Sequence, residues 1–312
     1  MPKLLICSRQ SDEYQQLIAA ANLTGLEIVT APDPDCELIF GEPNLIRDVL
    51  VQLPRLKWVQ ASWAGVEPLL DPALRHDYIL TNARGVFGGL MSEFVFGYLL
   101  LHERKILQRL EAQKLSKWDA TLPGSLRGKT IGLLGVGSIG AELAKTSRFF
   151  GMKVYGFTRA SETCAQVDRY FHGAASAQEQ ADTLQSFAKE LDYLVSVLPN
   201  TAETRKIISA EVLAALPRQA LFINVGRGSA VDESALIKAL ETGALAGAVL
   251  DVFEQEPLPA AHPLWKTPNT FITSHTSAPS FPADLAAVFI ENYRLFAAGQ
   301  APKYQVDFER GY

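Results

Sequence analysis

The stretch Gly135-Val136-Gly137-Ser138-Ile139-Gly140 decides the fold of this chain. The apolar run Thr130–Leu134 precedes it, and an amphipathic segment ending at Phe150 leads to a second apolar run, Lys153–Phe157. This order of strand, glycine turn, helix and strand is typical of a dinucleotide-binding unit. The glycines permit a tight turn, a close approach of the pyrophosphate and close packing of helix on strand, and the helix N-terminus offers N–H groups to the phosphates. The cofactor-binding residues predicted from this stretch are Gly135, Gly137, Ser138, Ile139 and Gly140.

The end of the second strand indicates which dinucleotide binds. Sites specific for NAD usually place Asp or Glu there to hold the ribose 2′-OH. Here the strand runs into Thr158 and Arg159, and the first carboxylate is the later Glu162. Arg159 can pair with a 2′-phosphate, and Thr158 and Ser161 can donate hydrogen bonds to it. The alternative for Arg159 is a solvated surface side chain. The sequence therefore favours NADP(H), with NAD(H) as the alternative.

Composition and charge exclude several classes of protein. The chain has 312 residues, of which 48% are hydrophobic and 20% charged, so that two ordinary globular domains fit its length. A formal net charge of −5 gives no electrostatic support for nucleic-acid binding. We find no apolar run of membrane-spanning length, no signal peptide and no metal-binding motif. The scattered cysteines, Cys7, Cys36 and Cys164, favour a reducing, cytoplasmic location.

Alternating strand and helix signals predict two α/β domains, each a doubly wound parallel sheet. We expect a flavodoxin-like substrate domain, residues 1–95 plus 283–312, and a Rossmann cofactor domain, residues 96–282, with a cleft between them. One long helix is expected over Leu90–Leu110. A last helix over Ala283–Ala298 returns to the first domain. The expected strands are Lys3–Ile6, Leu38–Phe40, Trp58–Gln60, Ile79–Thr81, Thr130–Leu134, Lys153–Phe157, Tyr193–Val197, Ala220–Asn224, Ala246–Leu250 and Thr270–Ile272.

Three polar residues follow the late strands and suit hydride transfer to a carbonyl, which requires a proton donor and a substrate anchor. Arg227 follows a strand and offers a guanidinium fork to a carboxylate, although a capping or surface role is the alternative. His275 can exchange a proton near neutral pH, although most histidines taken alone are structural. Glu256 beside His275 would favour the imidazolium, and its alternative is a solvated loop carboxylate. The other histidines have no strand-end glycine or polar loop: His76, His102, His172 and His262.

The ordered motifs resemble the D-isomer-specific 2-hydroxyacid dehydrogenases. The motifs are Gly135-x-Gly137-x-x-Gly140, Asn224-x-x-Arg227-Gly228, Leu250-Asp251-Val252-Phe253-x-x-Glu256-Pro257 and Ser274-His275. Two further segments, Leu198–Thr204 and Gln255–Pro259, are similar to the glyoxylate/hydroxypyruvate reductase branch. The resemblance spans roughly Val59 to His275.

The resemblance implies roles for further residues. It implies that Asp251 orients the nicotinamide carboxamide and that Pro199 and Thr204 line the cofactor. The implied substrate-binding residues are Ala64, Gly65 and Val66, through their backbone N–H groups, together with Arg227. Trp63 and Trp118 are interpreted as core residues rather than as walls of the substrate pocket. Two departures bear on substrate preference, because Ser274 stands where the family usually has Pro, and Thr276–Ser280 differs from the usual small apolar turn.

The predicted function is NAD(P)H-dependent reduction of a small 2-keto acid, such as glyoxylate or hydroxypyruvate, to the D-2-hydroxy acid. His275 is the expected proton donor, Glu256 holds it charged, and a homodimer is expected from the family. The alternative is an NAD(H)-sensing, corepressor-like dimer with little turnover, against which the absence of long terminal extensions argues. A phosphoglycerate or formate dehydrogenase would share the chemistry and differ in the pocket.

Overall fold

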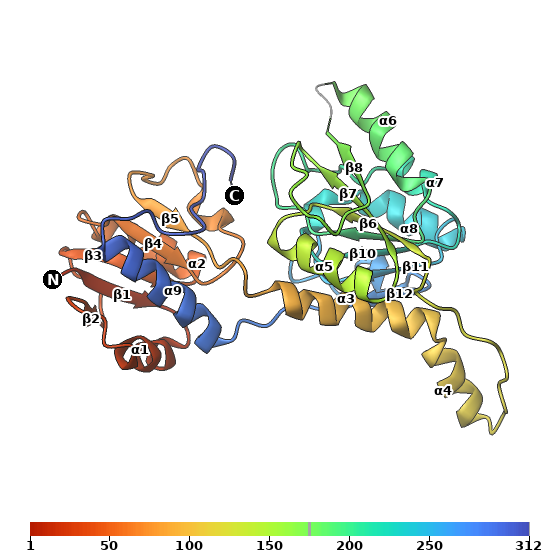
Figure 1. Cartoon of the computed structure of the whole chain (residues 1–312), viewed down its shortest axis with the longest axis horizontal. Helices are drawn as coiled ribbons and strands as arrows, with labels where there is room; N and C mark the ends of the chain where they lie inside the picture. The colour runs from red at the N-terminus through yellow and green to blue at the C-terminus, as the bar shows by residue number, and fades with distance from the viewer. Residues whose placement is uncertain (174–175, 312) are drawn as a thin grey trace. The chain divides into compact units, whose positions relative to one another are not determined.

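The computed structural model describes residues 1–173 and 176–311 (Figure 1). The chain divides into two compact units, unit 1 with Met1–Val86 and Pro279–Tyr312, and unit 2 with Phe87–Ala278. These limits differ from the expected boundaries at 95/96 and 282/283, because the helix that follows Phe87 packs against a helix of unit 2. We propose 86/87 and 278/279 as the domain boundaries.

Unit 1 is a parallel sheet in the order β2-β1-β3-β4-β5, with its core on both faces. The Phe289 ring of α9 stacks on Trp58 of β4 at 5.3 Å and lies 5.4 Å from Phe40 of β3. The residues adjacent to these in the strands, such as Ile39 and Val59, point to the other face of the sheet. There they belong to a core cluster that includes Ile46 of α2. The elements are β1 (Lys3–Cys7), α1 (Ser11–Ala20), β2 (Glu27–Val29), β3 (Cys36–Gly41), α2 (Pro43–Val49), β4 (Trp58–Ala61), β5 (Ile79–Thr81) and α9 (Pro282–Ala297), with short 3₁₀ turns η1 (Leu50–Gln52) and η2 (Glu67–Leu69).

Unit 2 is a parallel sheet of seven strands in the order β12-β11-β10-β9-β6-β7-β8. The order reverses between β6 and β9, which is the switch point where open α/β sheets bind ligands. Phe222 of β10 packs toward α6 and α8, and its neighbour Ile223 packs toward α3 and α5. The strands are β6 (Thr130–Leu134), β7 (Lys153–Thr158), β8 (Arg169–His172), β9 (Tyr193–Ser196), β10 (Leu221–Asn224), β11 (Gly247–Leu250) and β12 (Thr270–Ile272). The helices are α3 (Gly88–Glu103), α4 (Ile106–Lys114), α5 (Ser138–Phe149), α6 (Ala177–Ala188), α7 (Ala210–Ala215) and α8 (Glu233–Glu241), with 3₁₀ turns η3 (Gly228–Ala230) and η4 (Pro263–Lys266).

The two parallel α/β sheets confirm the predicted fold class. The strands β2 and β8 were not predicted, because each is short and begins with an exposed charged residue, Glu27 or Arg169, so that neither forms an apolar run. The single helix expected over Leu90–Leu110 is wrong. It breaks where Lys105 adopts a left-handed φ of 53°, and no Gly or Pro marks that position. Within the described residues, no helix is long and apolar enough to cross a membrane.

Candidate active site

Three neighbouring strand ends of unit 2 carry the predicted catalytic side chains. Arg227 follows β10, Glu256 lies in the loop after β11, and His275 follows β12. These strands are adjacent and parallel, so their carboxyl ends meet at one edge of the sheet. The topology therefore brings together side chains that are 48 positions apart in the sequence.

His275 and Glu256 form a direct ion pair. His275 Nδ1 lies 2.8 Å from Glu256 Oε2, and the backbone N–H of Phe253 donates to Glu256 Oε1 at 2.9 Å. The His275 side chain is 50% exposed, and within the described residues its Nε2 atom has no hydrogen-bond partner. The imidazole is thus held from one side and accessible from the other.

The electrostatics of the pair favour both charged forms. The hydrogen bond to Glu256 raises the pKa of His275 above its ordinary value, against an opposing contribution from burial and from the Arg227 charge. Burial alone would raise the pKa of Glu256, but the hydrogen bonds from His275 and Phe253 and the nearby positive charges lower it below its ordinary value. Both shifts therefore favour an imidazolium facing a carboxylate.

Glycines fix the loop that presents Arg227. A Cβ atom at Gly226 would lie 2.6 Å from the backbone nitrogen of Leu198, and one at Gly228 would lie 1.8 Å from the carbonyl carbon of Phe253. These two glycines let the neighbouring loops at Leu198 and Phe253 pack closely against this one. Arg227 Nη1 donates to the carbonyl of Gly226 at 2.8 Å.

Asp251 anchors the loop that carries His275. Its side chain is fully buried, and its Oδ1 accepts hydrogen bonds from the Thr273 hydroxyl at 2.5 Å and the Thr276 N–H at 2.8 Å. Its Oδ2 accepts from the Ser277 N–H at 3.1 Å, and its backbone carbonyl accepts from His275 N–H at 2.8 Å. His275 itself adopts a left-handed φ of 55°. This anchoring role was missed in the sequence, and the contact of Asp251 with a nicotinamide carboxamide stays a prediction.

The glycine turn has the geometry that a dinucleotide needs. Gly135 has a φ of 93°, which is costly for any residue with a side chain, and Cβ at Gly140 would lie 2.2 Å from the carbonyl oxygen of Gly135. A Cβ at Gly137 would meet nothing within 4 Å. Gly137 is the N-cap of α5, and Ser138 and Ile139 form its first turn, where backbone N–H groups have no intrahelical partner. The open space beside Gly137 fits a pyrophosphate at the N-terminus of α5.

The loop after β7 is more internally bonded than the sequence suggested. The Thr158 hydroxyl donates to the Ser161 carbonyl at 2.7 Å, so its single proton is already used. The Arg159 guanidinium pairs with Glu203, a carboxylate from the loop after β9. Glu203 was not singled out in the sequence, because no local pattern links residues 44 positions apart.

Pro199 and Thr204 lie in the same loop after β9, beside the switch point. The Thr204 hydroxyl donates to the Pro199 carbonyl at 2.6 Å. Thr204 also contacts Thr201 through its hydroxyl and backbone. The visible role of Thr204 is to close this turn, and its contact with a cofactor stays a prediction.

The loop after β4 in unit 1 keeps its backbone N–H groups available. The carbonyl of Ala64 accepts a hydrogen bond from Asn82 Nδ2 at 2.8 Å, and the carbonyl of Trp63 accepts one from the Ala83 N–H at 3.0 Å. In the part of the chain that the structure describes, the N–H groups of Ala64, Gly65 and Val66 make no hydrogen bond. The loop is held by its carbonyls, and its donors can meet an anion.

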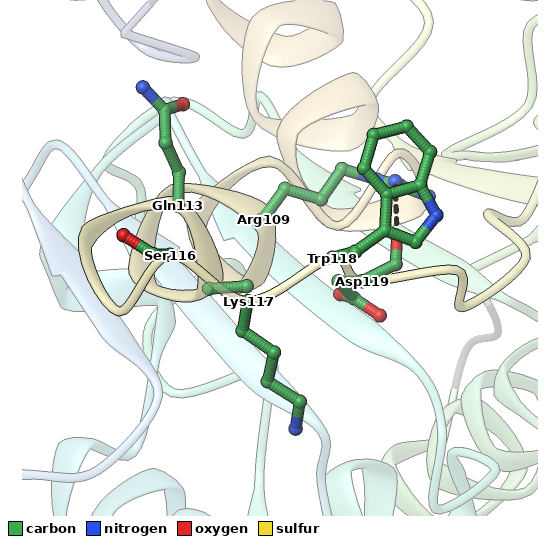
Figure 2. A pocket seen from close by; sticks show the side chains of 7 residues that line it. Arg109, Gln113, Ser116, Lys117, Trp118 and Asp119 are labelled. Carbon is green, nitrogen blue, oxygen red and sulfur yellow. Dashed lines mark hydrogen bonds between the residues drawn. The ribbon is translucent and has the colours of Figure 1, made fainter.

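Neither tryptophan named in the sequence analysis is a core residue. Trp63 is 38% exposed and Trp118 is 93% exposed, so the expected core placement of both is wrong. Trp118 lies after α4, and Figure 2 shows it beside Arg109, whose Nη1 donates to the Asp119 carbonyl at 3.4 Å. The hollow drawn there contains none of the predicted catalytic or cofactor residues.

His172 also lies at a strand end, which the sequence interpretation had denied. It is the last residue of β8 and is followed by Gly173. Its Nε2 lies 2.6 Å from Glu162 Oε1, and its Nδ1 lies 3.2 Å from the Thr158 hydroxyl. The error has the same cause as the missed strand, since β8 begins with an exposed Arg169 and forms no apolar run that would show where it ends. Among residues 1–173 and 176–311, no cluster of His, Cys, Asp and Glu side chains could hold a metal ion.

A family profile and known proteins are similar to this chain over more than half of its length. The family profile described as the NAD binding domain of D-isomer specific 2-hydroxyacid dehydrogenases matches residues 96–277. A glyoxylate/hydroxypyruvate reductase A of Serratia proteamaculans is 32% identical over 287 residues, which cover 89% of this chain and 88% of the relative.

Two solved structures are similar over nearly the whole chain. A D-isomer specific 2-hydroxyacid dehydrogenase family protein of Aeromonas salmonicida is 41% identical with a TM-score of 0.89, covering 98% of this chain and 99% of the other. A D-isomer specific 2-hydroxyacid dehydrogenase of Xanthobacter autotrophicus, solved in complex with NADPH and MES, is 32% identical with a TM-score of 0.86, covering 100% and 99%.

Proposed function

The chain belongs to the D-isomer-specific 2-hydroxyacid dehydrogenase family, and from this premise we propose that it reduces small 2-keto acids such as glyoxylate and hydroxypyruvate with NADPH. Membership makes it an NAD(P)-dependent oxidoreductase of 2-hydroxy acids. The substrate proposal is supported by the glyoxylate/hydroxypyruvate reductase among its relatives. No observation on the described residues favours the alternative of an NAD(H)-sensing binding protein.

The observation that carries the proposal is the 2.8 Å contact between His275 Nδ1 and Glu256 Oε2, with the Arg227 charge acting on both groups. The reduced nicotinamide, when bound, supplies hydride to the keto carbon. His275 then gives the proton on its accessible Nε2 to the keto oxygen, while Glu256 stabilises the imidazolium through Nδ1. Arg227 binds the substrate carboxylate through its guanidinium fork.

The N–H groups of Ala64, Gly65 and Val66 are proposed as further donors to the substrate carboxylate. Their support is the lack of hydrogen-bond partners among the described residues. Asp251 is proposed to orient the carboxamide while it anchors the His275 loop, since a carboxylate can accept about four hydrogen bonds and this one is seen to accept three.

The preference for NADPH rests on the loop after β7. Arg159 stands where an NAD-specific site would have a carboxylate, and the relative from Xanthobacter autotrophicus was solved with NADPH. Arg159 is paired with Glu203 in the structure, but the Arg159 side chain is 53% exposed and the Glu203 side chain is 68% exposed. Such a surface pair is worth about 0–1 kcal/mol, so a 2′-phosphate can displace Glu203 from the guanidinium.

We also propose a homodimer in the cytoplasm. The support for a dimer is that α4 buries none of its own residues and that α4 and the segment after it expose large apolar side chains, namely Ile106, Leu107, Leu110, Leu115, Trp118 and Leu122. The support for a reducing compartment is that all three cysteines are unpaired.

Replacing His275 by Ala tests the proton donor. We expect kcat for glyoxylate and hydroxypyruvate reduction to fall roughly a hundredfold to ten-thousandfold, while NADPH binding measured by fluorescence is unchanged. His262→Asn is the matched control, because His262 caps η4 and Asn can keep that cap. Near-normal turnover in His275→Ala would contradict the assignment. Running both cofactors against a range of 2-keto acids in the same assays identifies the substrate class.

A further inference from the structure

We propose that Glu203 is a specificity-determining residue of the cofactor site, which accepts a hydrogen bond from the ribose 2′-hydroxyl of NADH and competes with the 2′-phosphate of NADPH for Arg159. The pair formed by these two side chains then serves either cofactor and keeps the preference for NADPH moderate. This inference rests on the NADPH preference proposed above. It gives a role to a residue that belongs neither to the glycine turn nor to the catalytic residues.

Glu203 and Arg159 reach one another from strands on opposite sides of β6. Both β7 and β9 pair with β6. Arg159 directly follows β7, and Glu203 lies in the loop after β9. Because parallel strands end at one edge of the sheet, these two loops flank the glycine turn Gly135–Gly140 that follows β6. The hydrogen bond from Arg159 Nη2 to Glu203 Oε2 therefore joins the two loops beside the turn to which the pyrophosphate is assigned.

The pair brings a carboxylate to the strand end where the sequence has none. An NAD-specific site uses an acidic side chain at the end of the second strand to accept a hydrogen bond from the ribose 2′-hydroxyl. This chain has Thr158 and Arg159 there. Glu203 comes to Arg159 from 44 positions further along the chain. Within the described residues its Oε1 atom has no hydrogen-bond partner, so this oxygen can accept one from a hydroxyl.

The backbone of Glu203 is fixed on both sides, whereas its side chain is mostly in solvent. On one side of the turn, the Thr204 hydroxyl donates to the Pro199 carbonyl at 2.6 Å. On the other, the Lys206 N–H donates to the Ser229 carbonyl at 2.8 Å, which ties the loop to the segment after β10. The Glu203 side chain is 68% exposed. Glu203 can therefore release Arg159 by rotating its side chain, while the loop keeps its place.

The two cofactors make different demands on this pair. With NADH bound, Arg159 and Glu203 stay paired, and the guanidinium holds the carboxylate that accepts the 2′-hydroxyl. With NADPH bound, the 2′-phosphate takes the guanidinium and Glu203 turns toward solvent. Separating an exposed ion pair lowers an affinity by no more than about fivefold. Glu203 thus weakens the binding of NADPH a few-fold and strengthens the binding of NADH by one hydrogen bond.

The test measures the Kd of each cofactor by fluorescence titration of the full-length protein. We expect Glu203→Ala to bind NADPH about two- to fivefold more tightly than wild type and NADH about three- to tenfold more weakly. Glu203→Gln keeps an acceptor for the 2′-hydroxyl and loses the charge, so it should gain for NADPH and lose less for NADH. Damage to the loop would weaken both cofactors, so changes of opposite sign identify a specificity role. Changes of the same sign in both variants, or no change in either, overturn the inference.

Two controls separate competition for Arg159 from a general effect of charge. Glu211→Gln removes the same charge at the start of α7, where the carboxylate accepts from the Ser209 hydroxyl at 2.6 Å, and should keep both wild-type Kd values. In the Arg159→Ala background there is no guanidinium to compete for, so adding Glu203→Ala should no longer improve NADPH binding. A gain of full size in that background overturns the competition.

The NADPH preference itself is tested without the nicotinamide. Calorimetric titration compares adenosine 2′,5′-bisphosphate with 5′-AMP, which differ only in the 2′-phosphate. If wild type binds the two equally, or Arg159→Ala binds the bisphosphate as well as wild type does, the proposed NADPH preference is wrong. If wild type favours the bisphosphate through Arg159 and Glu203→Ala still binds NADH as well as wild type does, only the role of Glu203 is wrong.

Discussion

The charge of His275 depends chiefly on one hydrogen bond, the one to Glu256. Replacing Glu256 by Gln keeps the shape of the side chain and removes its charge, so the pKa of His275 should fall. Reduction needs the imidazolium, so kcat/KM for keto-acid reduction is retained below the pKa of His275 and lost as the pH rises through it. The alkaline limb of the profile should move to lower pH in Glu256→Gln, with turnover at neutral pH lowered roughly tenfold.

The profile in the oxidation direction provides the control for this prediction. There the neutral imidazole accepts the proton, so the same loss of charge should extend activity toward lower pH. Loss of activity in both reaction directions, with no shift of either profile to lower pH, would show that Glu256 acts on something other than the proton of His275. Neither limb should move in Glu233→Gln, since Glu233 supports the neighbouring backbone through the Glu254 N–H without touching His275.

At the same scale, the sequence predicted side chains better than it predicted their partners. That Arg227, Glu256 and His275 lie at one edge of the sheet could be predicted because each comes after a strand, and parallel strands bring their carboxyl ends together; their catalytic roles stay predictions. Glu203 could not be found as the partner of Arg159, nor Thr273 and Ser277 as partners of Asp251. These contacts depend on loop conformations that no short-range periodicity encodes.

At the scale of elements, two substitutions in the glycine turn should have different effects, one on stability and the other on cofactor affinity. Gly140→Ala places a methyl group 2.2 Å from the Gly135 carbonyl oxygen, so α5 must shift, and we expect a loss of about 1–3 kcal/mol in the free energy of unfolding. Gly137→Ala meets nothing within 4 Å, and its φ of −80° and ψ of −157° suit alanine. We expect this variant to keep its melting temperature and to lose NADPH affinity, because its methyl group enters the space assigned to the pyrophosphate.

Denaturant unfolding and cofactor titration of the two proteins check this pair. Equal affinity in Gly137→Ala and wild type would place the pyrophosphate elsewhere. The comparison is informative because both changes add one methyl group within the same turn, so that only the surroundings of the new atom differ.

The elements also show where periodicity stops being informative. Long buried strands such as β6 and β7 were predicted within a residue of their ends, because apolar runs flanked by glycine are unambiguous. The break at Lys105 was not, since a left-handed residue without Gly or Pro leaves no signal. The edge strand β8 was not predicted because it begins with an exposed charged residue, and the position of His172 at its end was therefore missed.

For the whole molecule, the alternation of strands and helices was enough to predict two parallel sheets, but the domain limits depend on packing. The segment Gly88–Val95 was assigned to the first domain by its place in the sequence. The packing of α3 along α5 puts it in unit 2. A helix shows which face is apolar and does not show which neighbour covers that face.

The exposed apolar side chains of the helix α4 bear on the oligomeric state of the protein. The helix has nine residues, none buried, and helices of that length without packing are marginal in water. Leu110, 45% exposed, and Leu107, 43% exposed, therefore suggest cover by a second copy. We expect Leu110→Glu to convert a dimer to a monomer in size-exclusion chromatography with light scattering. Gln113→Glu, which adds the same charge to the same helix at a polar position, should leave the dimer intact. A wild-type monomer at micromolar concentration, or equal masses for the two variants, would contradict the proposal.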